Sequence, residues 1–130
     1  MYVLDTNTLI YFFKGLGNVS VQMLSKAPAE IAIPAIVLYE IEVGIGKSGA
    51  SQKRKEQLRE LAGLTTILDF GRKEAEIAAT VRLDLEKEGM LIGPYDILIA
   101  ATTIASNGIL ITRNKKEFER IESLKIQDWY

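Results

Sequence analysis

Short apolar runs, too brief to form helices, alternate along the whole chain with longer stretches of helical periodicity. This alternation is typical of a domain in which helices join parallel strands and cover both faces of the sheet. The 130 residues contain no repeat and no low-complexity linker, so we expect one domain over residues 1–130. It should be an α/β sandwich of three layers with a central, mostly parallel sheet. The expected strands are residues 2–4, 31–33, 65–68, 109–112 and 125–127.

Prolines and glycines mark where several of the intervening helices begin and end. Pro34 and Pro94 suit a first helical turn, and Gly89 closes a long amphipathic stretch. The stretch that follows Pro34 is apolar nearly all round, and the one that follows Pro94 is small and apolar, so both should be buried. The predicted helices span residues 8–13, 18–26, 35–46, 50–61, 72–87, 94–105 and 113–118.

The chain contains neither cysteine nor histidine. Disulfides, thiolate nucleophiles, imidazole bases and the usual ligands of zinc are therefore excluded. The formal net charge is −1, so any binding of nucleic acid must depend on local basic patches. No signal peptide or membrane-spanning segment is recognisable, and a cytoplasmic location is the expectation, with no membrane partner.

Three acidic residues occupy unusual positions. Asp5 ends the first predicted strand, Glu40 lies inside an apolar helix, and Asp96 lies in the first turn of a buried helix. Each position has an ordinary structural explanation: a helix cap for Asp5, a satisfied core acid for Glu40, and a charge that complements the helix dipole for Asp96. A parallel sheet would, however, bring all three to one edge, around one cavity.

Carboxylates held close together repel one another unless a cation compensates them. Oxygen ligands without imidazole or thiolate favour Mg²⁺, with Mn²⁺ as an alternative, and Mg²⁺ commonly uses one or two carboxylates plus water. Such a site suits metal-assisted hydrolysis of phosphodiesters, which needs no protein nucleophile. Thr6 and Asn7 are expected to help fix the Asp5 carboxylate, and Thr112 ends the fourth predicted strand nearby.

Four segments carry a resemblance to a known family. They are Val3-Leu4-Asp5-Thr6-Asn7, Glu40-Ile41-Glu42-Val43-Gly44, Ile92-Gly93-Pro94-Tyr95-Asp96 with Ile99-Ala100-Ala101, and Leu110-Ile111-Thr112-Arg113-Asn114 followed by Glu117-Phe118. In this order they make the whole chain resemble the PIN-domain ribonuclease toxins of the VapC kind, from type II toxin–antitoxin pairs.

The resemblance implies a PIN-like fold and a Mg²⁺-dependent endoribonuclease. Asp5 and Asp96 would be the principal metal ligands, and Glu40 would complete the acidic pocket. Many family members have a fourth acid where this chain has Asn114, so either Asn114 or Glu117, one helical turn further on, would supply the fourth group. The resemblance also implies a homodimer and a small VapB-like antitoxin that covers the pocket, with DNA contacted only through that antitoxin.

Arg113, Lys115 and Lys116 lie near the expected mouth of the site and could bind RNA phosphates. A PIN-domain nuclease that processes RNA without an antitoxin is an alternative function, as is a non-catalytic binding or co-repressor module. Phosphotransfer of the haloacid-dehalogenase type is disfavoured, because its first motif needs an acid where Asn7 stands and a threonine where Leu9 stands.

Overall fold

The computed structural model of the chain describes residues 1–130 and contains one five-stranded sheet and seven α-helices. In chain order the elements are β1 (Tyr2–Leu4), α1 (Thr6–Lys14), α2 (Val19–Leu24), the 3₁₀ turn η1 (Pro28–Glu30), β2 (Ile31–Pro34), α3 (Ala35–Gly46), α4 (Ser51–Leu64), β3 (Thr66–Leu68), α5 (Arg72–Lys87), α6 (Pro94–Ala105), β4 (Ile109–Ile111), α7 (Lys115–Phe118) and β5 (Lys125–Gln127).

The sheet is parallel throughout, with the strand order β3-β2-β1-β4-β5. β1 is the central strand, and its Val3 pairs with Ala32 of β2 on one side and with Leu110 of β4 on the other. These three residues are fully buried. Parallel strands covered on both faces require such continuous apolar runs, which explains why the strands of this chain do not alternate apolar with polar residues.

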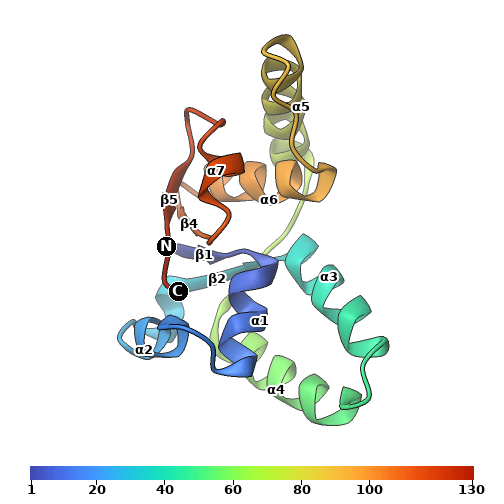
Figure 1. Cartoon of the computed structure of the whole chain (residues 1–130), viewed down its shortest axis with the longest axis vertical. Helices are drawn as coiled ribbons and strands as arrows, with labels where there is room; N and C mark the ends of the chain where they lie inside the picture. Colours follow the sequence, from blue (N-terminus) through green and yellow to red (C-terminus); the bar gives the residue numbers. More distant parts are fainter.

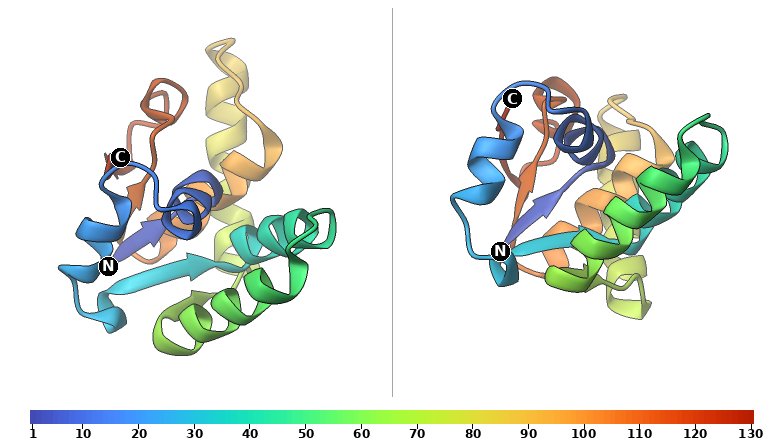
Figure 2. Two further views of the ribbon diagram at one scale, coloured as in Figure 1. Left: turned by 60° about the horizontal axis from the view of Figure 1, so that its bottom comes forward. Right: turned by 90° about the horizontal axis from the view of Figure 1, so that it is seen from below.

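Helices form a layer on each side of the sheet, which confirms the predicted three-layer sandwich. In Figure 1, α1 to α4 lie below β1 and β2, whereas α5, α6 and α7 lie above them. Figure 2 shows β1 and β2 running side by side in the same direction and leading into α1 and α3. The chain therefore enters α1 and α3 from the carboxyl edge of the sheet, where ligand sites of α/β folds usually form.

The buried helix α6 lies between the sheet and α5, and small side chains let it approach both. Ala100, Ala101 and Thr103 have no exposed surface. The hydroxyl groups of Thr102 and Thr103 donate to carbonyl oxygens one turn earlier, at 2.8 and 2.9 Å, so burying them leaves no unpaired polar group. None of the helices combines the length and the apolar character that a membrane span requires.

The predicted elements differ from the structure mainly at their ends. α1 begins at Thr6, two residues earlier than predicted, because Asp5 caps it. α2 stops at Leu24, α4 continues to Leu64, and α7 is a single turn that begins at Lys115. Helix ends depend on caps and tertiary contacts more than on periodicity, so these differences of a few residues follow from local geometry.

Candidate active site

Asp5 is the first side chain beyond β1, and it is the N-cap of α1. Its Oδ1 atom accepts a hydrogen bond of 2.8 Å from the backbone N–H of Thr8, and the residue is only 6% exposed. Asp5 therefore does cap α1, as its ordinary structural explanation proposes. A cap uses one carboxylate oxygen, however, and the capping bond leaves Oδ2 available to another partner.

Threonine hydroxyl groups tie the ends of β1 and β4 together beneath this carboxylate. Thr8 Oγ1 donates to the Ile111 carbonyl at 2.9 Å, and the backbone N–H of Asp5 donates to the same oxygen at 3.2 Å. The side chain of Thr112 is fully buried and hydrogen-bonds with Asp5, while its Oγ1 accepts from the Asn114 N–H at 3.0 Å. Thr112 thus lies where its side chain acts on the Asp5 carboxylate.

Glu40, on α3, is held by a residue 34 positions earlier in the chain. Thr6 Oγ1 donates to Glu40 Oε1 at 2.7 Å, and both residues are half-buried. Thr6 therefore orients Glu40 and not Asp5, contrary to the prediction. Asn7 also differs from the prediction, because its side chain is exposed and forms no hydrogen bond to a protein group. The turn that carries Asp5 points the Asn7 side chain toward solvent.

Asp96, in the first turn of α6, is coupled to the other acids through space. Burial raises the pKa of Asp96 to about 6, and the charges of Glu117, Asp5 and Glu40 add to the increase, in that order. Burial likewise raises the pKa of Asp5; hydrogen bonds from Thr112 and Thr8 oppose this, and the charge of Glu40 adds to it. We call Asp5, Glu40, Asp96 and Glu117 the acid cluster.

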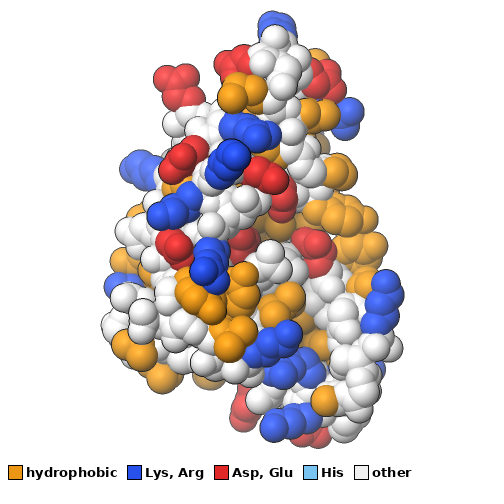
Figure 3. Space-filling model, in the orientation of Figure 1, with side chains coloured by type: hydrophobic (Ala, Val, Ile, Leu, Met, Phe, Trp, Pro, Cys, Tyr) orange, Lys and Arg blue, Asp and Glu red, His pale blue; other side chains and the backbone are white.

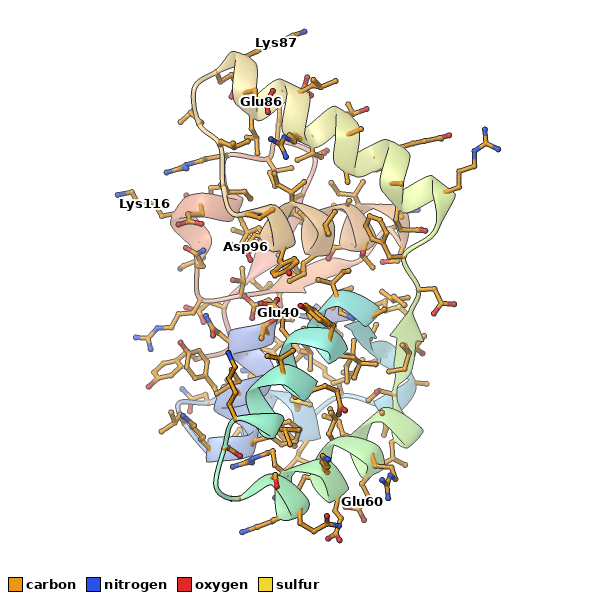
Figure 4. All side chains as sticks on the ribbon, turned by 90° about the vertical axis from the view of Figure 1, so that its right-hand side faces the viewer. Glu40, Glu60, Glu86, Lys87, Asp96 and Lys116 are labelled. Carbon is orange, nitrogen blue, oxygen red and sulfur yellow. The ribbon has the colours of Figure 1, made fainter.

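The acid cluster draws on four different elements. In Figure 4, Glu40 on α3 and Asp96 on α6 lie on facing sides of the space between these helices, whereas Glu60 and Glu86 lie near opposite ends of the molecule. No lysine or arginine forms a salt bridge with the cluster, since both salt bridges of the structure connect residues within α5. The repulsion among the four carboxylates is therefore not compensated by the protein.

The donor set of this cluster fits a hard divalent cation. No three acidic side chains lie close enough to enclose a metal ion by themselves. Mg²⁺, however, keeps several waters and commonly uses only one or two carboxylates, and a cation would remove the repulsion that raises the pKa of Asp96. The group able to receive the ion comprises Asp5 and Asp96, with Glu40 and Glu117 within electrostatic range.

Glu117 contributes to the cluster more directly than Asn114 does. The charge of Glu117 is the largest electrostatic influence on the pKa of Asp96. Asn114 is half-buried at the N-terminus of α7, where its backbone N–H bonds to Thr112 and its side chain caps nothing. Glu117, one helical turn after Asn114, is thus a charged candidate for the fourth group that the resemblance implies.

The basic residues of the predicted RNA-binding patch differ in their freedom to bind. The guanidinium carbon of Arg113 lies 3.6 Å from the ring centroid of Tyr130, and this ring packs edge-to-face on Tyr11. Lys115 and Lys116, in contrast, are exposed on α7. Figure 3 shows basic side chains interleaved with acidic ones over this part of the molecule. The Tyr130 ring therefore positions the Arg113 cation, whereas Lys115 and Lys116 extend into solvent.

A groove between α1, α3 and α4 adjoins the acid cluster and has a volume of about 290 Å³. It includes Glu40, but neither Asp5 nor Asp96. Its wall is mainly apolar, with Lys14 and Arg54 among its polar residues. We call it the α1–α3–α4 groove; the apolar side chains that line it are Ile10, Phe13, Ile41, Ile45 and Ala50.

Two features of the site were not predicted from the sequence. The backbone N–H of Thr8 binds the Asp5 carboxylate, and the Thr8 hydroxyl binds β4. A hydroxyl residue three positions after a capping acid was the sequence pattern from which this role could have been predicted. Tyr39 and Tyr95 meet edge-to-face across α3 and α6. Each directly precedes an acid of the cluster, but only the tertiary structure shows that the two rings touch.

The raised pKa of Asp96 predicts how stability depends on pH. Between about pH 4 and 6 the folded chain binds more protons at Asp96 than the unfolded chain, whose carboxyl titrates near 3.8, so this residue lowers the free energy of unfolding as pH rises. Asp5 acts in the same direction. As pH rises across this window, the free energy of unfolding of D96N should therefore increase by about 1 kcal/mol relative to that of wild type. This value allows for screening by solvent, because Asp96 is only half-buried. Urea unfolding in the presence of a chelator measures it, and a difference that is constant with pH would contradict the raised pKa.

Comparison with known proteins agrees with this geometry. Residues 2–124 match the family model "PIN domain". The chain is 35% identical over 132 residues to ribonuclease VapC2 of Rickettsia felis, covering 99% of this chain and 98% of that protein. It is 29% identical to the tRNA(fMet)-specific endonuclease VapC of Salmonella typhimurium, covering 98% and 97% of the two chains.

Solved structures show the same relationship. The R. felis VapBC2 complex bound to a DNA fragment from its promoter superposes with a TM-score of 0.88 at 35% identity, and DNA-bound VapBC from S. typhimurium with a TM-score of 0.91 at 28% identity. In both cases the match covers 99% of this chain and 98% of the other. The chain therefore belongs to the PIN-domain family and, within it, to the VapC ribonucleases.

Proposed function

We propose that this protein is a Mg²⁺-dependent endoribonuclease that acts as the toxin of a type II toxin–antitoxin pair. The observation that carries the proposal is the acid cluster itself. Four carboxylates from separate elements lie within electrostatic range of one another and form no salt bridge with a basic side chain, and burial and mutual repulsion raise the pKa of Asp96 to about 6. The relatives named as ribonucleases give the substrate class.

Each residue of the cluster has a role that follows from its surroundings. Asp5 and Asp96 would hold the ion, because Asp5 keeps one oxygen free of its cap and the charge of Asp5 acts on Asp96. A bound Mg²⁺ or Mn²⁺ ion neutralises charge on the scissile phosphate and lowers the pKa of an attacking water. Glu40 is fixed through Oε1 by Thr6, so its Oε2 can accept a hydrogen bond from that water and orient it. Glu117 adds negative charge that strengthens cation binding.

Removal of divalent ions should abolish cleavage. Purified protein incubated with a mixed RNA substrate is expected to cleave it in Mg²⁺ or Mn²⁺ and to lose all detectable cleavage in excess EDTA, because the carboxylates then have no cation through which to engage a phosphate. Gel analysis of the products measures this, and adding back Mg²⁺ should restore it. Cleavage that persists in EDTA would overturn the proposed mechanism.

The toxin role adds an antitoxin to the proposal. The related VapBC structures are complexes, and the mainly apolar α1–α3–α4 groove includes Glu40 in its wall. An antitoxin segment that places apolar side chains in this groove and a basic side chain against the acid cluster would both bind tightly and block catalysis. Expression of the protein should arrest growth, and co-expression of the neighbouring gene should relieve the arrest. Growth unaffected by expression would favour an RNA-processing nuclease.

The proposed assembly is a homodimer, as the resemblance implies. Tyr11, Phe12 and Phe13 on α1 are half-buried and pack against the core. Exposed apolar side chains occur instead on α2, α3, α5 and α6 and in the α5–α6 loop, and they include Leu24, Val43, Leu83 and Leu91. Light scattering of the purified protein decides between a dimer and a monomer.

The basic residues after β4 should bind RNA phosphates. Replacing Arg113, Lys115 and Lys116 with glutamine is expected to weaken RNA binding and to reduce the slope of log affinity against log salt by about 0.7 for each phosphate that the protein no longer neutralises. Fluorescence anisotropy at several salt concentrations measures the slope. K87Q, at the far end of α5, is the control for removal of a lysine. An unchanged slope in the triple variant would show that these residues do not bind RNA.

A further inference from the structure

Two exposed aromatic rings meet beside the acid cluster. Tyr39 of α3 and Tyr95 of α6 pack edge-to-face, with ring centroids 5.7 Å apart and an interplanar angle of 70°. Their hydroxyl groups are 3.4 Å apart. Tyr39 is 52% exposed and Tyr95 is 44% exposed, so much of each ring faces solvent. We call Tyr39 and Tyr95 the tyrosine pair.

The pair lies next to the carboxylates because of where each tyrosine stands in its helix. Tyr39 directly precedes Glu40, and Tyr95 directly precedes Asp96. Successive helical residues point about 100° apart, so the rings stand beside the acids and do not cover them.

Two separate helices fix the rings. α3 and α6 belong to the layers on opposite sides of the sheet (Figure 1), and the edge-to-face contact of the two rings bridges these helices. A tyrosine loses little conformational entropy on binding, and a ring already held by a neighbouring ring loses less. The pair is therefore a rigid aromatic surface at the rim of the acid cluster, with polar hydroxyl groups at its edge.

A strand of RNA whose scissile phosphate reaches the acid cluster must place its adjacent bases near this rim. Unpaired bases stack on exposed aromatic side chains, and such stacking tolerates any base because every base has a π-face. From this juxtaposition we propose that the tyrosine pair is a stacking platform for the nucleobase next to the scissile phosphate. The inference rests on the proposed nuclease function and adds a substrate-binding subsite to it.

The platform implies that the enzyme engages RNA that is single-stranded at the cleavage point. A paired base stacks on its neighbours within a helix and cannot lie against a ring on the protein surface. The preferred substrates are then loops, bulges or unpaired segments. A second copy of this chain packed on the rings is the competing occupant, and the polar hydroxyl groups and the adjacent carboxylates favour RNA over an apolar protein contact.

Binding of a single-stranded oligoribonucleotide of about 12 nucleotides tests the proposal, because sites of this kind span roughly 4–16 nucleotides. The background is D96N, which should bind RNA with Mg²⁺ present without cleaving it. Y39A and Y95A are each expected to reduce affinity about 10-fold, whereas Y39F and Y95F, which keep the ring, should stay within about twofold. V43A is the matched control: Val43 is exposed on the same face of α3, one turn further along.

A second RNA isolates the base. It carries an abasic nucleotide beside the bond that wild type cleaves, first on one side and then on the other. At one of the two positions, the abasic RNA should bind D96N about 10-fold more weakly than intact RNA does. Adding Y39A or Y95A to D96N should not weaken the binding of this abasic RNA any further. The proposal is overturned if the alanine variants bind intact RNA normally, if they weaken intact and abasic RNA equally, or if light scattering shows that their weaker binding accompanies dissociation of a dimer.

The same experiment separates this inference from the function on which it rests. Cleavage of the intact oligonucleotide by wild type, with and without Mg²⁺, tests the nuclease assignment. If wild type cleaves RNA only with Mg²⁺, and Y39A and Y95A cleave it with the same KM as wild type, the stacking platform alone is overturned. Absence of cleavage under every divalent ion overturns the nuclease assignment itself.

Discussion

Replacement of Asp96 by asparagine is expected to reduce RNA cleavage by about 10³-fold, equivalent to about 4 kcal/mol of transition-state stabilisation, because the variant loses one of two carboxylates that would hold the cation. Asparagine has nearly the same shape and keeps an oxygen at the site, so the fold should be retained. The loss should appear mainly in the rate at saturating RNA, since the ion acts on the reacting phosphate.

The control for D96N is D84N, because Asp84 is exposed on α5 and lies outside the acid cluster. It should cleave RNA like wild type. Thermal unfolding with and without Mg²⁺ supplies a second measurement: the ion should stabilise wild type and D84N, but it should stabilise D96N much less, by the linkage between binding and folding. If D96N cleaved RNA normally, or if Mg²⁺ stabilised it as much as wild type, Asp96 would have no role in binding the ion.

Loss of activity in D96N should coincide with unchanged or increased stability of the metal-free protein. The carboxylates of the acid cluster repel one another, and removing one charge reduces that repulsion, as a bound cation would. A residue kept for packing behaves in the opposite way, since its replacement destabilises the fold. The combination of lower activity with undiminished stability is thus the expected signature of a functional acid in this chain.

Replacement of Phe118 by alanine should destabilise the protein by about 3–5 kcal/mol, the usual cost of emptying a buried phenylalanine site. Phe118 is 1% exposed and is among the largest fully buried side chains. It also anchors α7, which is only one turn long and carries Glu117. The variant should therefore weaken the coupling of Glu117 to Asp96 in the molecules that remain folded.

Urea unfolding measures the stability of F118A, and L24A is the control. Leu24 is 82% exposed, so its truncation should change the free energy of unfolding by less than about 0.5 kcal/mol. RNA cleavage by F118A, assayed at a temperature where the variant is folded, then reports on Glu117. If F118A lowered the free energy of unfolding by less than about 1 kcal/mol, the surrounding side chains would have filled the space left by the phenylalanine ring.

Much of this site could be expected before the structure was known. The alternation of apolar runs and helical stretches depends only on residues that are close in the sequence. It therefore predicted a parallel sheet and the position of every strand within about two residues. That topology brings strand ends to one edge, which is why Asp5, Glu40 and Asp96 could be grouped although they lie far apart in sequence. The absence of histidine and cysteine then restricted the chemistry to oxygen ligands.

The features that were missed depend on contacts between distant residues. Thr6 was expected to hold Asp5, but the path of α3 brings Glu40 within 2.7 Å of its hydroxyl. Arg113 was expected to be a free cation for RNA, but the chain folds Tyr130 beneath it. No local pattern encodes either contact, because side-chain partners that lie far apart in sequence are chosen by packing.

The sequence alone determined the residue types available to the site, the strand that delivers Asp5, and the family to which the chain belongs. Only the tertiary structure decided that the charge of Glu117 acts on Asp96, that Asp5 is at once a helix cap and a member of the acid cluster, and that the rings of Tyr39 and Tyr95 touch. The reason is physical: periodicity and caps act within a few residues, whereas repulsion among carboxylates and contact between rings act through space.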